Sequence, residues 1–175
     1  MKKYLAEMVG TMVLVLMGCG VAIALGCNST VGANTASVVG TSMAFGLAVV
    51  AMAYTIGGIS GCHINPAITL GCFLTKRISA KDCGMYMLFQ VIGAFIGAGI
   101  LACLFGCESG LGANALQAGN GVTLCQGLTA EIVFTCVFVL VVLGTTSEKG
   151  AGNLAGLAIG LTLVLVHLAC IYFTG

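Results

Sequence analysis

The sequence predicts an all-α polytopic membrane protein, from its apolar composition, its scarcity of charge and the positions of its few charges. Hydrophobic residues make up 59% of the 175 residues and glycine contributes another 27, whereas only 6 residues are basic and 5 are acidic. A soluble domain carries about 25% charged residues, so this chain could not cover a water-facing surface. With a net charge of only +1 as well, the composition argues against a soluble enzyme, a secreted disulfide module, a nucleic-acid-binding protein and a disordered segment.

The positions of the basic residues predict how the chain crosses the membrane. They lie in three groups: Lys2 and Lys3; Lys76, Arg77 and Lys81; and Lys149. The positive-inside rule places all three groups in the cytoplasm, so the number of crossings between successive groups is even. The apolar run from Met8 to Leu25 has no obvious cleavage site, and we expect it to remain as the first crossing. The prediction is a multi-pass protein of the plasma or inner membrane with a cytoplasmic N-terminus.

The sequence between the first two basic groups is long enough for two crossings and leaves an additional apolar segment. Helices of about 20 residues fit at 4–25 and 37–57, joined by a polar turn from Asn28-Ser29-Thr30 to Asn34-Thr35. Residues 57–74 are apolar but too short to cross the membrane and return. Such a stretch is tolerated at membrane depth only where protein buries it or where it lines a wet cavity, so we predict a re-entrant segment.

The local sequence predicts the shape of this re-entrant segment. Gly57-Gly58-Ile59-Ser60-Gly61 is typical of a flexible loop. Asn65 is a good helix N-cap and Pro66 suits the first helical position, so residues 67–74 should continue as a helix of about half a bilayer thickness. The segment is expected to dip into the membrane and to return toward Lys76 as a half-helix.

Three further crossings are predicted in the rest of the chain, at 83–106, 125–145 and 153–173. A Gly- and Asn-rich loop at 106–121, which contains Glu108, lies on the outer side. The predicted organisation has three parts: a first repeat (1–106) with three crossings and the half-helix, an extracellular connecting loop (107–124), and an incomplete second repeat (125–175) with two crossings.

An internal repeat supports this organisation. Ala6-Glu7-Met8-Val9-Gly10-Thr11 aligns with Ala130-Glu131-Ile132-Val133-Phe134-Thr135 at an offset of 124, and Ala44-Phe45-Gly46-Leu47 aligns with Ala158-Ile159-Gly160-Leu161 at an offset of 114. Three crossings separate the two units, so the second copy is inverted in the membrane, as in transporters and channels whose sites lie near the midplane. On this offset the partner of Asn65 would fall at about position 179, past Gly175.

The stretch Ser60-Gly61-Cys62-His63-Ile64-Asn65-Pro66-Ala67-Ile68-Thr69 resembles the first Asn-Pro-Ala loop of the aquaporin and glycerol-facilitator family, the major intrinsic proteins. The similarity extends over the whole chain, through the Ala-Glu pairs that open both repeats, Gln90 in the third crossing, and Ala158-Ile159-Gly160-Leu161 followed by His167. The resemblance implies the aquaporin-like inverted repeat, of which this chain holds five of six transmembrane helices and the first re-entrant half-helix. It also implies a homotetramer when complete, with one pore in each subunit.

The resemblance further implies which residues form the pore. Asn65, followed by Pro66 and Ala67, would donate its side-chain amide to the permeating molecule, beside a ladder of backbone carbonyls from Gly61, Cys62 and His63. Phe45 and His167 match two of the four positions of the family's aromatic/arginine constriction, and the other two would lie past Gly175. The apolar pore wall is matched by four residues that the repeat also pairs: Leu14, Val49, Phe138 and Leu163.

These features predict a passive water channel that excludes ions and protons. A narrow conduit with one apolar wall and one row of hydrogen-bonding groups replaces the partners that water loses without holding it tightly. The positive end of the half-helix dipole at Asn65 would repel cations and orient water against proton relay. The resemblance also implies that His167 with Phe45 forms a tight constriction that favours water, because family members that pass glycerol usually have a small residue at the position of His167. A facilitator of glycerol or small neutral solutes is the nearest alternative. No enzymatic activity, cofactor or nucleic-acid partner is implied.

Polar residues within the apolar stretches have more than one interpretation. Glu7 and Glu131 could be proton-relay groups, but their repeated placement favours hydrogen bonding to re-entrant backbone, with Gln90 as a further structural polar residue. His167 could serve as a hydrogen-bond partner between helices. His63 beside Cys62 has no further ligand at zinc-like spacing, so we expect no metal site. The ten cysteines are expected to be mostly buried and reduced.

Two alternatives of other classes remain. A thiol-based metal or redox carrier would use the cysteines, and water flux that survives replacement of all of them would remove this interpretation. A product that ended at Gly175 would lack the second half-helix and leave backbone and cavity open to lipid, so we expect it to conduct poorly. Codons for Asn-Pro-Ala-Arg about four residues after Gly175 would establish the family and the completeness of the repeat together.

Overall fold

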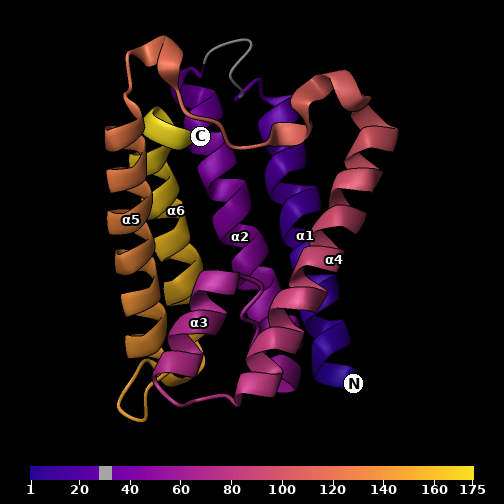
Figure 1. Cartoon of the computed structure of the whole chain (residues 1–175), viewed down its shortest axis with the longest axis vertical. Helices are drawn as coiled ribbons and strands as arrows, with labels where there is room; N and C mark the ends of the chain where they lie inside the picture. Colours follow the sequence, from indigo (N-terminus) through magenta and orange to yellow (C-terminus); the bar gives the residue numbers. More distant parts are fainter. Residues whose placement is uncertain (28–32) are drawn as a thin grey trace.

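Long apolar helices form the framework of the molecule. In the computed structural model, which describes residues 1–27 and 33–175, five helices are long and apolar enough to cross a bilayer. They are α1 (Lys2–Ala24), α2 (Thr35–Ser60), α4 (Ala80–Phe105), α5 (Leu124–Thr145) and α6 (Ala155–Thr174), and the half-helix is α3 (Pro66–Leu74). Figure 1 shows the long helices side by side and α3 confined to one half of their length. The predicted fold class and the five crossings are confirmed.

The connections between the helices contain short 3-10 turns, and one predicted loop is part of a helix instead. The turns are η1 (Cys107–Gly112), η2 (Ala118–Asn120) and η3 (Gly152–Leu154). The prediction of a flexible loop at 57–61 was wrong, because α2 continues through both glycines to Ser60 and only Gly61 leaves it, as a left-handed C-cap with φ of 87°. At membrane depth a helix satisfies its own backbone, which outweighs the conformational freedom that glycine would gain in a loop.

The turn predicted between the first two helices falls partly on residues 28–32. Asn28-Ser29-Thr30 therefore lies outside the described residues. The far end of that turn is described, and Asn34 caps α2 there: its side chain accepts a hydrogen bond from the backbone N–H of Ser37 at 2.9 Å, while the Ser37 hydroxyl accepts from the Asn34 backbone N–H. This reciprocal pair satisfies donors that a helix N-terminus otherwise leaves open.

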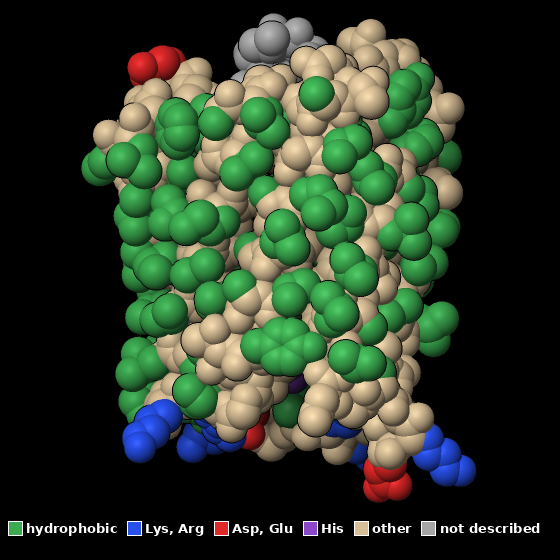
Figure 2. All heavy atoms as spheres, turned by 180° about the vertical axis from the view of Figure 1, so that it is seen from behind, with side chains coloured by type: hydrophobic (Ala, Val, Ile, Leu, Met, Phe, Trp, Pro, Cys, Tyr) green, Lys and Arg blue, Asp and Glu red, His purple; other side chains and the backbone are tan. Residues whose placement is uncertain are grey.

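Lys and Arg side chains gather at one end of the molecule, an acidic side chain projects from the opposite end, and apolar side chains cover the flanks (Figure 2). We call the end that carries Lys76, Arg77 and Lys81 the basic end, and the opposite one the far end. On the flanks, large apolar side chains point outward, and Phe95 and Leu140 are 75% and 70% exposed. Such a surface is stable where lipid, rather than water, surrounds it.

The cysteines do not follow the prediction that most of them are buried. Only Cys27, Cys72 and Cys83 are buried, whereas four others are exposed on the outside of the molecule: Cys103, Cys107, Cys125 and Cys136. A thiol behaves as a small apolar group, so it can face lipid as readily as it packs in a core. Among the described residues every cysteine is free of a disulfide.

A close crossing of α2 and α6 displays the inverted repeat. A Cβ atom added to Gly46 would lie 2.5 Å from the carbonyl oxygen of Gly160, and one added to Gly160 would lie 2.6 Å from the carbonyl oxygen of Gly46. Val164 approaches Gly46 in the way that Val50 approaches Gly160. Gly46 and Gly160 are separated by the offset of 114 that relates the two repeats, and so are Val50 and Val164. The local two-fold axis of the repeat therefore passes through this crossing, where small residues let the backbones touch.

Candidate functional site

The re-entrant backbone between α2 and α3 has an unusual conformation. Gly61, Cys62 and Ile64 all have positive φ, at 87°, 51° and 41°. A residue with a side chain is strained in this region, at a cost of about 1 kcal/mol or more each. The conformation of Cys62 and Ile64 must therefore be held in place by the surrounding structure.

Glu7 supplies that support from α1. Its side chain is fully buried, and each carboxylate oxygen accepts two hydrogen bonds. Oε1 accepts from the Ser60 hydroxyl at 2.6 Å and from the His63 backbone N–H at 2.9 Å. Oε2 accepts from the Ile64 backbone N–H at 2.6 Å and from Gln90 Nε2 at 2.7 Å. One buried carboxylate thus satisfies the backbone N–H groups of the buried residues His63 and Ile64 with charge-assisted bonds.

Thr69 links this cluster to Asn65, and its role was not foreseen from the sequence. Its hydroxyl is fully buried, donates to the Asn65 carbonyl at 3.0 Å, and accepts from Gln90 Nε2 at 3.0 Å. His63 Nδ1 lies 3.2 Å from the same hydroxyl. Because the single hydroxyl hydrogen is used on Asn65, His63 donates from Nδ1. The spacing of one helical turn between Asn65 and Thr69 was the available signal.

Asn65 begins the half-helix and lies at the end of the re-entrant loop. Its backbone is extended, and its Oδ1 accepts from the backbone N–H groups of Ala67 at 2.7 Å and Ile68 at 3.4 Å. Pro66 follows at the first helical position, where its missing N–H costs nothing. Since the oxygen is used in the cap, the amide NH₂ is the part of the side chain left for other partners. Pro66 itself is exposed.

Two cavities meet at Asn65. The basic-side cavity, of about 330 Å³, is lined on one wall by Gly61, Cys62 and His63, and on the other by Leu14 and Val49. The far-side cavity, of about 280 Å³, contains Phe45, Ala67 and His167 on its wall. Three residues line both cavities: Asn65, Phe138 and Leu163. The two cavities therefore share a wall at the tip of the half-helix.

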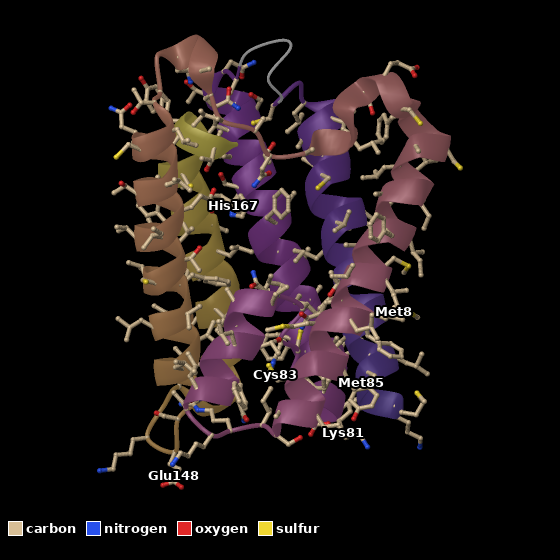
Figure 3. The ribbon with its side chains drawn as sticks, viewed as in Figure 1. Met8, Lys81, Cys83, Met85, Glu148 and His167 are labelled. Atoms are coloured by element: carbon tan, nitrogen blue, oxygen red, sulfur yellow. The ribbon has the colours of Figure 1, made fainter. Side chains whose placement is uncertain are left out.

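An aromatic pair narrows the far-side cavity. The rings of Phe45 on α2 and His167 on α6 are stacked, with centroids 4.5 Å apart. His167 Nδ1 lies 3.0 Å from the Leu163 carbonyl oxygen, which can only accept, so Nδ1 carries the hydrogen. This bond leaves Nε2 for other partners. Figure 3 places His167 well away from the basic end, where Lys81 and Glu148 lie.

Comparison with known proteins agrees with this geometry. Residues 1–175 match the family described as Major intrinsic protein. The chain belongs to the major intrinsic protein family. An Aquaporin Z from Rhodopseudomonas palustris is 41% identical over 180 residues, covering 98% of this chain and 74% of that protein. An Aquaporin Z from Brucella melitensis is 38% identical, covering 99% of this chain and 78% of that protein. The aquaglyceroporin from Plasmodium falciparum has the same fold, with a TM-score of 0.84 and 23% identity over 99% of this chain and 74% of that one.

Two predicted site residues of this major intrinsic protein, Glu131 and Pro66, do not have the surroundings that the sequence predicted for them. Glu131, the repeat partner of Glu7, is exposed and lines the far-side cavity. It accepts from the Thr174 hydroxyl and from the Cys170 thiol at 3.9 Å, so it contacts side chains of α6 where Glu7 binds loop backbone. Pro66 lies beside Asn65 but is absent from the linings of both cavities.

Two residues at the basic end were also not foreseen. Arg77 and Thr146 line the mouth of the basic-side cavity, and the sequence pattern assigned Arg77 to topology alone. Their contact joins segments far apart in the sequence, so no local motif indicates it. Within the described residues, no three His, Cys, Asp or Glu side chains lie close enough together to hold a metal ion.

Proposed function

We propose that this major intrinsic protein is a passive water channel whose conduit runs through the two cavities. The observation that carries the proposal is their junction at Asn65, where the tip of a half-helix faces the apolar side chains of Phe138 and Leu163. The names of the Aquaporin Z relatives support water as the permeant. A channel performs no covalent chemistry, so no catalytic residue is assigned.

The wall of the conduit is suited to water. Leu14, Val49 and Leu163 offer no hydrogen bonds, whereas the loop residues Gly61, Cys62 and His63, whose backbone carbonyls are the proposed acceptors, line the same cavity. A water molecule finds replacement partners along one side only, which holds it in line without trapping it. The Asn65 amide and the N-terminus of α3 present positive partial charge at the junction, which disfavours cations and orients the water oxygen. Ion and proton exclusion is therefore part of the proposal.

The proposal extends to membrane placement and assembly. With the basic end in the cytoplasm, the N-terminus is cytoplasmic and the half-helix enters from the inner side of the plasma or inner membrane. Water would enter from both ends of each subunit, and the gene product would assemble as a homotetramer in the bilayer.

Selectivity between water and glycerol is expected to depend on His167. In proteoliposomes that carry the gene product containing this sequence, stopped-flow light scattering should detect rapid water flux and little glycerol flux. His167→Gly removes the ring stacked on Phe45, so we expect glycerol flux to rise roughly tenfold. Leu165→Gly is the matched control, because Leu165 is on the same helix but is 63% exposed on the outside.

Two results would contradict the proposed function. Wild-type glycerol flux as fast as that of His167→Gly would identify a glycerol facilitator instead. Water flux that disappears when the ten cysteines are replaced by alanine, in a protein that remains folded, would favour the thiol-carrier alternative.

A further inference from the structure

The basic-side cavity has a charged residue at its mouth. Arg77 is the single arginine of the sequence, and it lines this cavity together with Ile78 and Thr146. Arg77 lies just after the C-terminal end of α3, and a short turn in which Lys76 has a φ of 60° separates it from the helix. The half-helix thus delivers the arginine to the opening through which a permeant from the basic end would pass.

Two hydrogen bonds fix the Arg77 guanidinium on the end of α5. One terminal nitrogen, Nη1, donates to the Thr146 hydroxyl at 2.7 Å, and the other, Nη2, donates to the Leu143 carbonyl at 2.8 Å. The planar fork of arginine matches two acceptors at once, which the point charge of a lysine does not. The last carbonyls of a helix also carry partial negative charge, so a cation is favoured there. The charge is therefore held at one position.

No carboxylate in the described part of the chain neutralises this charge by direct contact. The only ion pair there joins Lys3 to Asp82, with 2.9 Å between Nζ and Oδ2. Asp82 also accepts from the Tyr4 hydroxyl at 2.8 Å. Glu148 extends at the extreme basic end in Figure 3. Lys76 adds a second positive charge next to Arg77 in the chain, and Lys149 offsets Glu148, so the formal charges of these four residues sum to a positive value.

We propose that Arg77 is a specificity-determining residue: its guanidinium, fixed on α5, repels cations from the basic-end mouth of the conduit and draws small anions toward it. This role rests on the proposed function, since it adds a charge barrier to a channel for neutral molecules. It is separate from the dipole of α3, whose positive end lies deeper, at Asn65. Two charge barriers in series would disfavour cations at two depths.

Thiol modification at the mouth tests the inference without measuring flux. Ile78 is half-buried, lines the same cavity and follows Arg77. In the full-length gene product with its native cysteines replaced by alanine, Ile78→Cys is treated with trimethylammonioethyl or sulfonatoethyl methanethiosulfonate. Each rate is divided by the rate of that reagent with a free thiol in solution. We call the normalised rate of the anionic sulfonatoethyl reagent, divided by that of the cationic trimethylammonioethyl reagent, the anion-to-cation ratio. At low salt this ratio should exceed one, and Arg77→Gln should reduce it about five-fold.

Controls separate the charge from the contacts of Arg77. Arg77→Lys should retain most of the ratio, because it keeps the charge while losing the fork. Lys81→Gln removes a charge at the same end that does not line the cavity, and should change the ratio by less than about two-fold. If Arg77→Gln fails to fold, the Ile78→Cys protein that retains Arg77 is tested at increasing salt concentration instead. Its anion-to-cation ratio must approach one in about 1 M salt if the charge of Arg77 sets it.

An unchanged ratio in Arg77→Gln, or a parent ratio at or below one at low salt, would overturn the inference. These outcomes are independent of water transport. A gene product that passes no water but shows the charge-dependent ratio would contradict the proposed function and leave the positive mouth in place.

Discussion

Glu7→Ala is expected to disrupt the re-entrant segment and to cost about 4 kcal/mol of unfolding free energy. The substitution leaves the buried backbone N–H groups of His63 and Ile64 without acceptors. The Ser60 hydroxyl and the Gln90 side-chain amide also lose the acceptor that Glu7 provides. Each unsatisfied buried group costs about 1–3 kcal/mol. The strained conformations of Cys62 and Ile64 also lose their support. Denaturant or thermal unfolding of the detergent-solubilised protein would measure the loss.

Two variants show whether the effect belongs to the hydrogen bonds of Glu7. Glu7→Gln keeps one carbonyl oxygen but directs an NH₂ group at other donors, so an intermediate loss of about 2 kcal/mol is expected. Glu131→Gln changes the repeat partner, which is exposed and binds only α6 side chains, and should cost less than about 1 kcal/mol. Equal losses for Glu7→Gln and Glu131→Gln would show that the buried carboxylate is not what holds the loop.

Gly93→Ala is expected to separate α1 from α4. A Cβ atom at Gly93 would overlap the carbonyl oxygen of Met8 on α1, which is backbone and cannot rotate away. Overpacking of this kind costs about 1–3 kcal/mol, and we expect the upper end of that range. The two helices are also tied at the basic end by Lys3 and Asp82, so the crossing has little freedom to move.

Gly99→Ala is the matched control on the same helix. A Cβ atom there would meet nothing within 4 Å. Alanine favours a helix over glycine by up to about 1 kcal/mol, so the variant should be neutral or slightly more stable. The comparison uses thermal unfolding of both variants in the same detergent. Similar stability of the two variants would contradict the close α1–α4 crossing.

Much of the fold could be predicted because lipid permits few structures. The lengths of the apolar runs, together with the three basic groups, locate the five crossings within a few residues of their ends. Asn65 and Pro66 locate the start of α3, since a cap and a first-turn proline act locally. The error at Gly57 and Gly58 has the same origin: their composition suggests a loop in water, whereas membrane depth favours a continued helix.

The candidate site was predictable only where a residue carries its signal in the local sequence. The loop residues and the aromatic pair were found through the motif that they resemble. Thr69 was missed because its contact with Gln90 joins the half-helix to α4, although its spacing from Asn65 is a local signal. Arg77 was assigned to topology because its acceptors on α5 are distant in the chain. Contacts of this kind depend on how the helices pack, which no single segment encodes.

The central claim is that the segment around Asn65 enters the membrane and turns back, so that its two flanks face opposite sides. Single cysteines at the native Cys62 and at Ala67→Cys test it most directly, because Cys62 lines the basic-side cavity and Ala67 the far-side cavity. Small membrane-impermeant thiol reagents would be added to either side of oriented vesicles. We expect Cys62 to react only from the side of the basic end, and the cysteine at position 67 to react only from the other side. Reaction of both from the basic end would contradict it.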